Sequence, residues 1–126
     1  IEKVFPSRTC LQGADLRPCG LTRTKAAAIA ALAQAVVRGT LELEKASDLD
    51  TFIKQCTSLR GIGEWTAQTI AMRGLGEVDA FPASDLGIIK ALSDAGQPSK
   101  PAHIRKMAER WRPWRSYAAM LLWMMR

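Results

Sequence analysis

The residues that most directly suggest chemistry form a short hairpin, the run Leu59-Arg60-Gly61-Ile62-Gly63. Its two glycines permit backbone torsions that other residues avoid, and they let a ligand approach the backbone closely. The hairpin also directs backbone N–H groups toward the positive end of the helix that follows, and such an arrangement binds phosphate. We expect Ile62 to turn inward, and since no side chain in the run reads a base edge, binding should not depend on nucleotide sequence. A helix-turn-helix corner without a ligand is the alternative interpretation.

Positive charge is concentrated at the end of the chain. The 126 residues include 18 lysines and arginines against 12 aspartates and glutamates, which gives a net charge of +6. Residues 100–126 hold seven of the basic residues and only one acidic residue, Glu109, and so account for the whole excess. A clustered basic face is typical of proteins that bind the phosphate backbone of nucleic acids, although ordinary solvated helices show it too.

The hairpin lies between segments that have the periodicity of helices. Apolar residues recur at helical spacing in five segments, residues 23–38, 49–56, 64–73, 85–96 and 101–111, and Pro113 starts a last helix. Ser47, with Asp50 three residues later, is a capping-box pattern before the second of these. Residues 75–83 read as a loop, and no segment alternates with the period of a strand. The sequence therefore predicts that residues 1–126 form one all-α domain of about six helices.

The last helix carries aromatic residues on two sides. At about 100° per residue, one apolar face holds Trp114, Tyr117, Ala118, Leu121 and Leu122. Trp123 falls on the opposite side, with Ser116, Ala119 and Met120. We predict that Trp111 and Trp114 belong to the core. Trp123 is explained equally well by a helix that is buried on both sides and by an aromatic side chain placed for a ligand.

Several classes of protein lack support in the sequence. The three cysteines, Cys10, Cys19 and Cys56, are an odd number at wide spacing, which fits neither a disulfide framework nor a CxxC metal pair. No apolar run reaches the ~20 residues of a membrane-spanning helix, and no signal peptide is recognisable. We therefore expect a cytosolic protein without a membrane partner. Because the chain begins at Ile1 rather than methionine, we expect it to be part of a longer protein.

Three ordered motifs resemble the helix-hairpin-helix DNA glycosylase superfamily: residues 59–67 (LRGIGEWTA), 72–74 (MRG) and 79–86 (DAFPASDL). In addition, residues 108–118 (AERWRPWRSYA) are similar to the closing segment of the DNA-3-methyladenine glycosylase II branch. The resemblance extends from about residue 5 to residue 123. It implies a multi-helix glycosylase domain that flips alkylated bases of the 3-methyladenine type out of duplex DNA and hydrolyses their N-glycosidic bonds.

The resemblance also implies a catalytic aspartate after the hairpin, and Asp85, 22 residues after Gly63, matches that position. Departure of a base leaves an oxocarbenium-like sugar, which a fixed carboxylate stabilises while it orients or deprotonates the attacking water. The alternative is that Asp85 only caps the next helix. Strand-cleaving relatives use a lysine just after the hairpin, where this chain has Trp65. Since no lysine stands between Lys54 and Lys90, we expect a monofunctional hydrolase.

The remaining site residues follow from the same resemblance. The base pocket is expected to contain Trp65, Thr69, Leu86 and Trp123, and aromatic faces there would attract the electron-poor, often cationic alkylated purines. Thr69 and Leu86 replace aromatic residues of better-studied pockets, which leaves the range of substrates open. The expected DNA contacts are Arg60, Gly61, Ile62, Gly63, Glu64 and Thr66. A monovalent cation is expected on the backbone carbonyls of Thr57, Leu59 and Ile62, and no other cofactor is expected.

In the family, further helices and a β-rich domain precede the segment that begins at Ile1, and they supply the residue that wedges into the duplex. We therefore expect the chain to work with an upstream part of the same polypeptide, and to self-associate through exposed apolar surface when it is alone. Two other functions stay open at this stage. One is a non-catalytic helix-hairpin-helix module that binds DNA through the hairpin and the basic segment, and the other is a related glycosylase for deaminated or oxidised bases.

Overall fold

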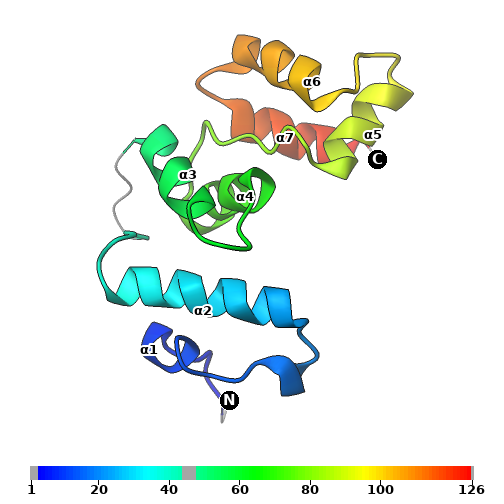
Figure 1. Cartoon of the computed structure of the whole chain (residues 1–126). Coiled ribbons are helices and arrows are strands. Elements are labelled where there is room, and N and C mark those ends of the chain that lie inside the picture. The colour runs from blue at the N-terminus through cyan, green and yellow to red at the C-terminus, as the bar shows by residue number, and fades with distance from the viewer. Residues whose placement is uncertain (1–2, 44–47, 126) are drawn as a thin grey trace. The chain divides into compact units, whose positions relative to one another are not determined.

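The computed structural model describes residues 3–43 and 48–125. Within them the secondary structure consists of seven α-helices and two 3-10 helices, without a strand, which confirms the predicted all-α class (Figure 1). The chain divides into two compact units, residues Ile1–Gly63 and Glu64–Arg126. None of the described helices is both long and apolar enough to span a membrane.

The first unit is built around one long helix. Its elements are α1 (Arg8–Leu11), η1 (Arg17–Cys19), α2 (Arg23–Val37) and α3 (Leu49–Thr57). Thr22 caps α2, because its hydroxyl oxygen accepts the N–H of Lys25 at 3.3 Å. After α2 the chain turns at Gly39, whose φ is +71°. The helix predicted for residues 23–38 is thus confirmed, and α1 packs against it.

The cap of α3 is an aspartate. The predicted cap, Ser47, lies outside the described residues, whereas the carboxylate of Asp48 accepts the N–H and the hydroxyl of Thr51 at 3.0 and 2.6 Å. The side chain of an aspartate at the N-cap accepts an otherwise unpaired backbone N–H of the first turn, as a serine would. Phe52 and Cys56 are fully buried, as the helical spacing predicts.

The hairpin after α3 packs closely on α2 through Gly61. Its φ of +90° lies in the left-handed region, and a Cβ at this position would lie 3.0 Å from the Cβ of Ala28. The alanine-rich face of α2 therefore allows an approach that only glycine tolerates. Ile62 is 6% exposed, and its N–H donates to the carbonyl oxygen of Leu59 at 3.1 Å. This confirms that Ile62 turns inward.

Gly61→Ala should lower the free energy of unfolding by about 2 kcal/mol, because both the left-handed torsion and the 3.0 Å contact oppose a side chain. Gly63→Ala is the matched control: its φ is not positive, and no heavy atom lies within 4 Å of its Cβ position. That variant should be as stable as the parent or gain up to about 1 kcal/mol. Urea denaturation followed by circular dichroism measures both, and equal losses would contradict the packing of the hairpin on α2.

The second unit consists of α4 (Glu64–Gly74), α5 (Leu86–Asp94), α6 (Pro101–Ala108), η2 (Glu109–Trp111) and α7 (Arg115–Met124). Helix α5 contacts α7. The core includes small and branched side chains from all four α-helices, with Ala67, Ala71, Ile88, Ile104, Ala108 and Ala119 fully buried. The segment between α4 and α5 contains no helix, in agreement with the loop predicted for residues 75–83.

Hydrogen bonds hold this loop against α4 and α7. The N–H of Phe81 donates to the side-chain oxygen of Gln68 on α4 at 2.9 Å. From α7, the buried hydroxyl of Ser116 lies 2.6 and 2.7 Å from the carbonyl oxygens of Glu77 and Ala80. These bonds satisfy buried polar groups and hold the end of the loop from which α5 begins.

A largely buried ion pair adds a second fastening. Arg115 is 8% exposed, and its guanidinium donates to both carboxylate oxygens of Asp79 at 2.8 and 2.9 Å. Arg112 also contacts Asp79, at 2.6 Å. Burial raises the pKa of Asp79, but the hydrogen bonds and charge of Arg115 outweigh it, so the pKa is lowered overall. Asp79 is therefore an ionised structural carboxylate that ties the loop to α7.

The basic segment is less positive than its composition indicates. Three of its cations contact carboxylates: Arg105 with Glu64, and Arg112 and Arg115 with Asp79 and Glu109. Lys100, Lys106 and Arg110 have no salt bridge to any residue in the described ranges. Part of the charge predicted to form a DNA-binding face thus serves the fold of the second unit.

Much of the apolar face described for the last helix is exposed in α7, although Leu122 on that face is buried. Trp114, Tyr117 and Leu121 are 57%, 53% and 62% exposed, whereas the buried residues are Arg115, Ser116, Ala119 and Leu122. The assignment of Trp114 to the core is therefore wrong. The error has a physical cause: Arg115 and Ser116 are buried because Asp79 and loop carbonyls satisfy them, and the spacing of apolar residues does not reveal such partners.

The start of α7 also differs from the prediction. Pro113 precedes the helix, which begins at Arg115. Between them the chain makes a turn in which the N–H of Trp114 donates to the carbonyl oxygen of Trp111 at 2.8 Å. The ring of Trp111 is half-buried and lies edge-on to Phe81, with 5.7 Å between the ring centroids.

Candidate active site

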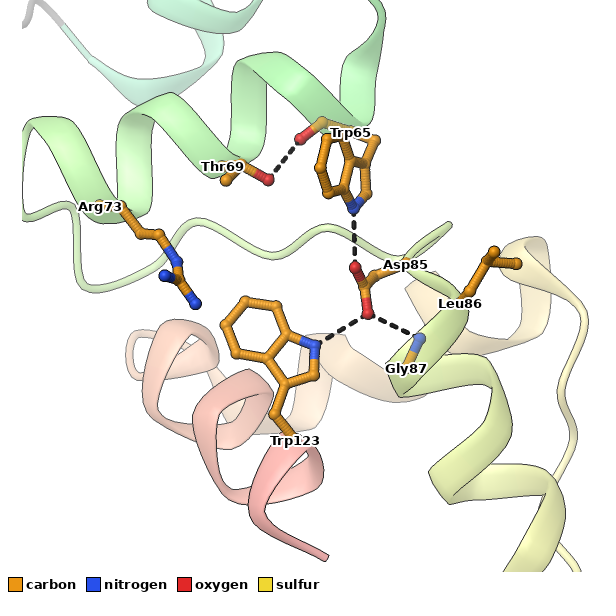
Figure 2. A pocket seen from close by; sticks show the side chains of 7 residues that line it. All are labelled: Trp65, Thr69, Arg73, Asp85, Leu86, Gly87 and Trp123. Carbon is orange, nitrogen blue, oxygen red and sulfur yellow. Dashed lines mark hydrogen bonds between the residues drawn. The ribbon is translucent and has the colours of Figure 1, made fainter. Parts of the chain in front are cut away.

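Asp85 stands where the loop meets α5, and both oxygens of its carboxylate accept hydrogen bonds (Figure 2). Oδ1 accepts the backbone N–H groups of Gly87 at 2.8 Å and Ile88 at 3.1 Å, so Asp85 is the N-cap of α5. The same oxygen accepts the indole N–H of Trp123 at 2.8 Å. Oδ2 accepts the indole N–H of Trp65, also at 2.8 Å. One carboxylate thus receives four N–H donors from three helices.

These donors keep the carboxylate ionised. Burial is the largest single influence and raises the pKa of Asp85, but the hydrogen bonds from Trp123, Trp65, Ile88 and Gly87 together outweigh it and lower the pKa below the ordinary 3.8. Asp85 is therefore an anion at neutral pH, and a weak base. Such a group stabilises developing positive charge better than it abstracts a proton.

Asp85 faces an open pocket of about 580 Å³ in the second unit. The pocket is lined by Trp65, Thr69, Arg73, Asp85, Leu86, Gly87 and Trp123. The structure therefore brings together the predicted catalytic residue and all four predicted pocket residues, which come from α4, α5 and α7. Thr69 donates its hydroxyl to the carbonyl oxygen of Trp65 at 2.8 Å, and Leu86 is 81% exposed.

Arg73 and Gly87 line the pocket without having been predicted as site residues, and of the two only Arg73 contributes a side chain. Its guanidinium carbon lies 5.1 Å from the centroid of the Trp123 ring, which is a cation–π contact (Figure 2). Trp123 is thus held at its N–H edge by Asp85 and across its ring by Arg73. The spacing carried a signal that identifies Arg73: Trp65, Thr69 and Arg73 follow each other at four-residue steps on one face of α4.

The predicted DNA contacts fall in two places. Arg60, Gly61 and Gly63 are exposed in the hairpin, whereas the buried side chain of Ile62 leaves only its backbone for a ligand. The other two, Glu64 and Thr66, lie in the first turn of α4. The carboxylate of Glu64 accepts the guanidinium of Arg105 at 2.9 Å.

The carbonyl groups predicted to hold a cation lie at the end of α3 and in the hairpin. The carbonyl oxygen of Leu59 accepts the N–H of Ile62 at 3.1 Å, which leaves one lone pair for another partner. Thr57 is the last residue of α3, and its hydroxyl donates to the carbonyl oxygen of Ile53 at 2.8 Å. In the described part of the chain, no group of three histidine, cysteine, aspartate or glutamate side chains is placed to hold a metal ion.

Trp123→Phe keeps an aromatic ring beside Arg73 but removes the N–H donated to Asp85. Hydrogen bonds to charged groups contribute about 1.5–3 kcal/mol, so the variant should lose about that much stability at neutral pH. Because the folded-state pKa of Asp85 is lowered, the stabilisation exists above the ordinary pKa and is lost as the pH falls through the folded value. The difference between parent and variant should therefore shrink in acid.

The control for that measurement is Trp114→Phe. The Trp114 ring is 57% exposed and lies on the other face of α7, so its loss of stability should stay below about 0.5 kcal/mol at every pH. Guanidinium denaturation at several pH values between neutral and strongly acidic supplies the comparison. If the two variants behaved alike, the indole hydrogen bond to Asp85 would be energetically unimportant.

Comparisons with known proteins give relatives that match nearly the whole chain. The probable bifunctional transcriptional activator/DNA repair enzyme AlkA from Mycobacterium tuberculosis is 40% identical over 123 residues, which are 98% of this chain and 25% of that protein. DNA-3-methyladenine glycosylase 2 from Escherichia coli (strain K12) is 37% identical over 122 residues, which are 94% of this chain and 42% of that protein. No family model matches the sequence.

A solved structure also resembles the chain. The Schizosaccharomyces pombe 3-methyladenine DNA glycosylase Mag1, in complex with abasic DNA, superposes with a TM-score of 0.81 at 26% identity, over 94% of this chain and 62% of that one. This likeness confirms the predicted fold. The chain spans between 25% and 42% of the length of the two sequence relatives described above.

Proposed function

We propose that this chain, which belongs to the DNA-3-methyladenine glycosylase branch of the helix-hairpin-helix DNA glycosylases, carries the base-excision site of a DNA repair enzyme. It hydrolyses the N-glycosidic bond of alkylated bases in duplex DNA after the base has been flipped into the pocket beside Asp85. The observation that carries the proposal is the ionised carboxylate of Asp85, fixed by four N–H donors in an open pocket between two tryptophans.

The proposed reaction uses Asp85 as a fixed negative charge. When the bond from C1′ of the sugar to the base nitrogen breaks, its electron pair leaves with the base, and positive charge develops on the sugar ring. The carboxylate stabilises that charge without having to reorganise, because its orientation is already set by the indole and backbone N–H groups. A water molecule then bonds to C1′ and releases a proton to solvent. Water is the nucleophile in this scheme, and we propose a monofunctional hydrolase.

The two tryptophans have different roles in the proposed recognition of the base. Arg73 already lies over the ring of Trp123, so a cationic base would have to compete with it there. The ring of Trp65 is 45% exposed beside the same carboxylate, and we assign stacking of the base to this ring. An electron-poor alkylated purine gains about 0.5–2 kcal/mol from such a face. The pocket volume of about 580 Å³ is in the range of small-molecule sites.

We assign binding of the DNA backbone to the hairpin. The structure accounts for Gly61 by its packing on α2, but nothing in the described residues requires glycine at position 63, where a Cβ would meet no heavy atom within 4 Å. A missing side chain with open space around it supports the proposal that a phosphate approaches the backbone at Gly63. We also propose that the backbone carbonyl oxygens of Thr57, Leu59 and Ile62 bind a monovalent cation. The lone pair of the Leu59 carbonyl that Ile62 does not use supports this proposal.

The exposed face of α7 supports a role for the rest of a longer polypeptide. Trp114, Tyr117, Met120, Leu121 and Met124 are all more than half exposed, and they recur at helical spacing. Apolar patches of this kind mark interaction sites. We propose that an upstream part of the same polypeptide covers this face, and that two copies of the isolated chain associate through it. Sedimentation velocity of the chain at several concentrations measures that association.

The activity is tested by base release from methylated duplex DNA, with chromatography of the free bases and a parallel measurement of DNA binding. The chain should release 3-methyladenine or 7-methylguanine, and Asp85→Asn should reduce the rate at least 100-fold while binding is retained, because the amide lacks the charge. Asp94→Asn is the matched control, since Asp94 lies on the same helix, exposed and paired with Lys90.

The outcome separates three functions. Release that depends on Asp85 supports the glycosylase. Release from duplexes that carry deaminated or oxidised bases, with none from methylated DNA, would change the proposed substrate class but keep the mechanism. DNA binding without release of any base, in a chain whose Asp85→Asn variant binds equally well, would favour the non-catalytic DNA-binding module and overturn the proposed activity.

A further inference from the structure

A second cavity lies in the first unit, beside the hairpin. It has a volume of about 430 Å³ and is lined by Arg23, Thr24, Ala27 and Ala31 of α2 and by Arg60 and Gly61 of the hairpin. Thr24, Ala27 and Ala31 recur at three- and four-residue steps, so they share the face of α2 on which Gly61 packs. Small residues therefore line the contact of helix and hairpin, and each partner contributes one arginine.

The charged side chains that line this cavity are both arginines. No carboxylate is among the lining residues, and neither Arg23 nor Arg60 has a salt bridge within the described ranges. Elsewhere in the structure, Arg17, Arg105, Arg112 and Arg115 each contact a carboxylate. Two guanidinium groups on one cavity, with no carboxylate to neutralise them, favour an anion that offers several oxygen atoms, and phosphate has this geometry.

We propose that Arg23 and Arg60 bind a backbone phosphate of DNA in this cavity, in addition to the phosphate at the hairpin backbone. The identity of the occupant rests on the proposed function. Along each strand of a duplex there is one phosphate per about 3.4 Å of helix axis. Because the hairpin lines the cavity through Arg60 and Gly61, a strand whose phosphate reaches the backbone at Gly63 brings a neighbouring phosphate to the two arginines.

The two sites have separate tasks in the chain. The pocket of Asp85 is lined entirely by residues of the second unit, and the arginine cavity entirely by residues of the first. Binding of the DNA backbone and cleavage of the bond to the base therefore depend on different side chains. Loss of the arginines should act through the affinity for DNA, whereas loss of Asp85 acts through bond cleavage.

The test is the salt dependence of DNA binding by Arg23→Gln, Arg60→Gln and the double variant. Fluorescence anisotropy with an undamaged duplex at several KCl concentrations gives the slope of log affinity against log salt. The double variant should bind about tenfold or more weakly, and its slope should be shallower by about 0.9, the value for one lost phosphate contact. Arg38→Gln is the matched control, since Arg38 ends the same helix and has no salt bridge in the described ranges.

The outcomes are decisive in each direction. A shallower slope in the double variant, with the parent slope in Arg38→Gln, supports the phosphate site. A parent slope in the double variant, or an equal change in Arg38→Gln, overturns it, as does tight binding of inorganic phosphate at the arginines without any effect of duplex DNA on them. Urea denaturation checks that the variants fold. The proposed function fails separately, if base release is absent or does not depend on Asp85.

Discussion

The acceptance of four N–H groups by the carboxylate of Asp85 is the interaction on which the rest of the second unit depends. The two backbone donors belong to α5, and the two indole donors come from α4 and α7. Burying a carboxylate is costly unless its oxygens are satisfied. The loop that carries Asp85 must therefore end where both indoles reach it. Ser116 and the Asp79–Arg115 ion pair hold the loop in that place.

Capping and catalysis, which are alternatives from the sequence alone, are compatible in the structure. As the N-cap of α5, Asp85 has one oxygen fixed by backbone N–H groups, and Trp65 fixes the other. The bonds that stabilise the helix therefore also orient the carboxylate, and they lower its pKa. A fixed ionised group is what stabilisation of an oxocarbenium-like sugar requires. Stability and proposed chemistry thus draw on the same hydrogen bonds.

Sequence reasoning was most reliable where a feature depends on local spacing. The periodicity of residues 23–38 predicted α2, the buried pair Phe52 and Cys56 followed from helical steps, and the motif after the hairpin identified residues that do share one pocket. Local spacing does not show which residues meet across the fold. The indole donors of Asp85 come from positions 20 and 38 residues away, and such bonds leave no periodic trace.

The same limit explains the errors. The apolar character of Trp114 predicts that it belongs to the core, but Trp114 is exposed and Arg115 and Ser116 are buried, where Asp79 and loop carbonyls satisfy them. Arg112 and Arg115 contribute to the predicted basic face, but both are paired with carboxylates. Arg73 lies within one of the family motifs, but its contact with Trp123 depends on the packing of α4 beside α7.

The central claim is that the N–H donors around Asp85 keep it ionised despite burial. The most direct measurement is an NMR titration of the side-chain carboxyl ¹³C resonance of Asp85 in the 126-residue chain. The account predicts a pKa below the ordinary 3.8. A pKa at or above that value would show that burial outweighs the four hydrogen bonds, and it would contradict the role of Asp85 as a fixed negative charge.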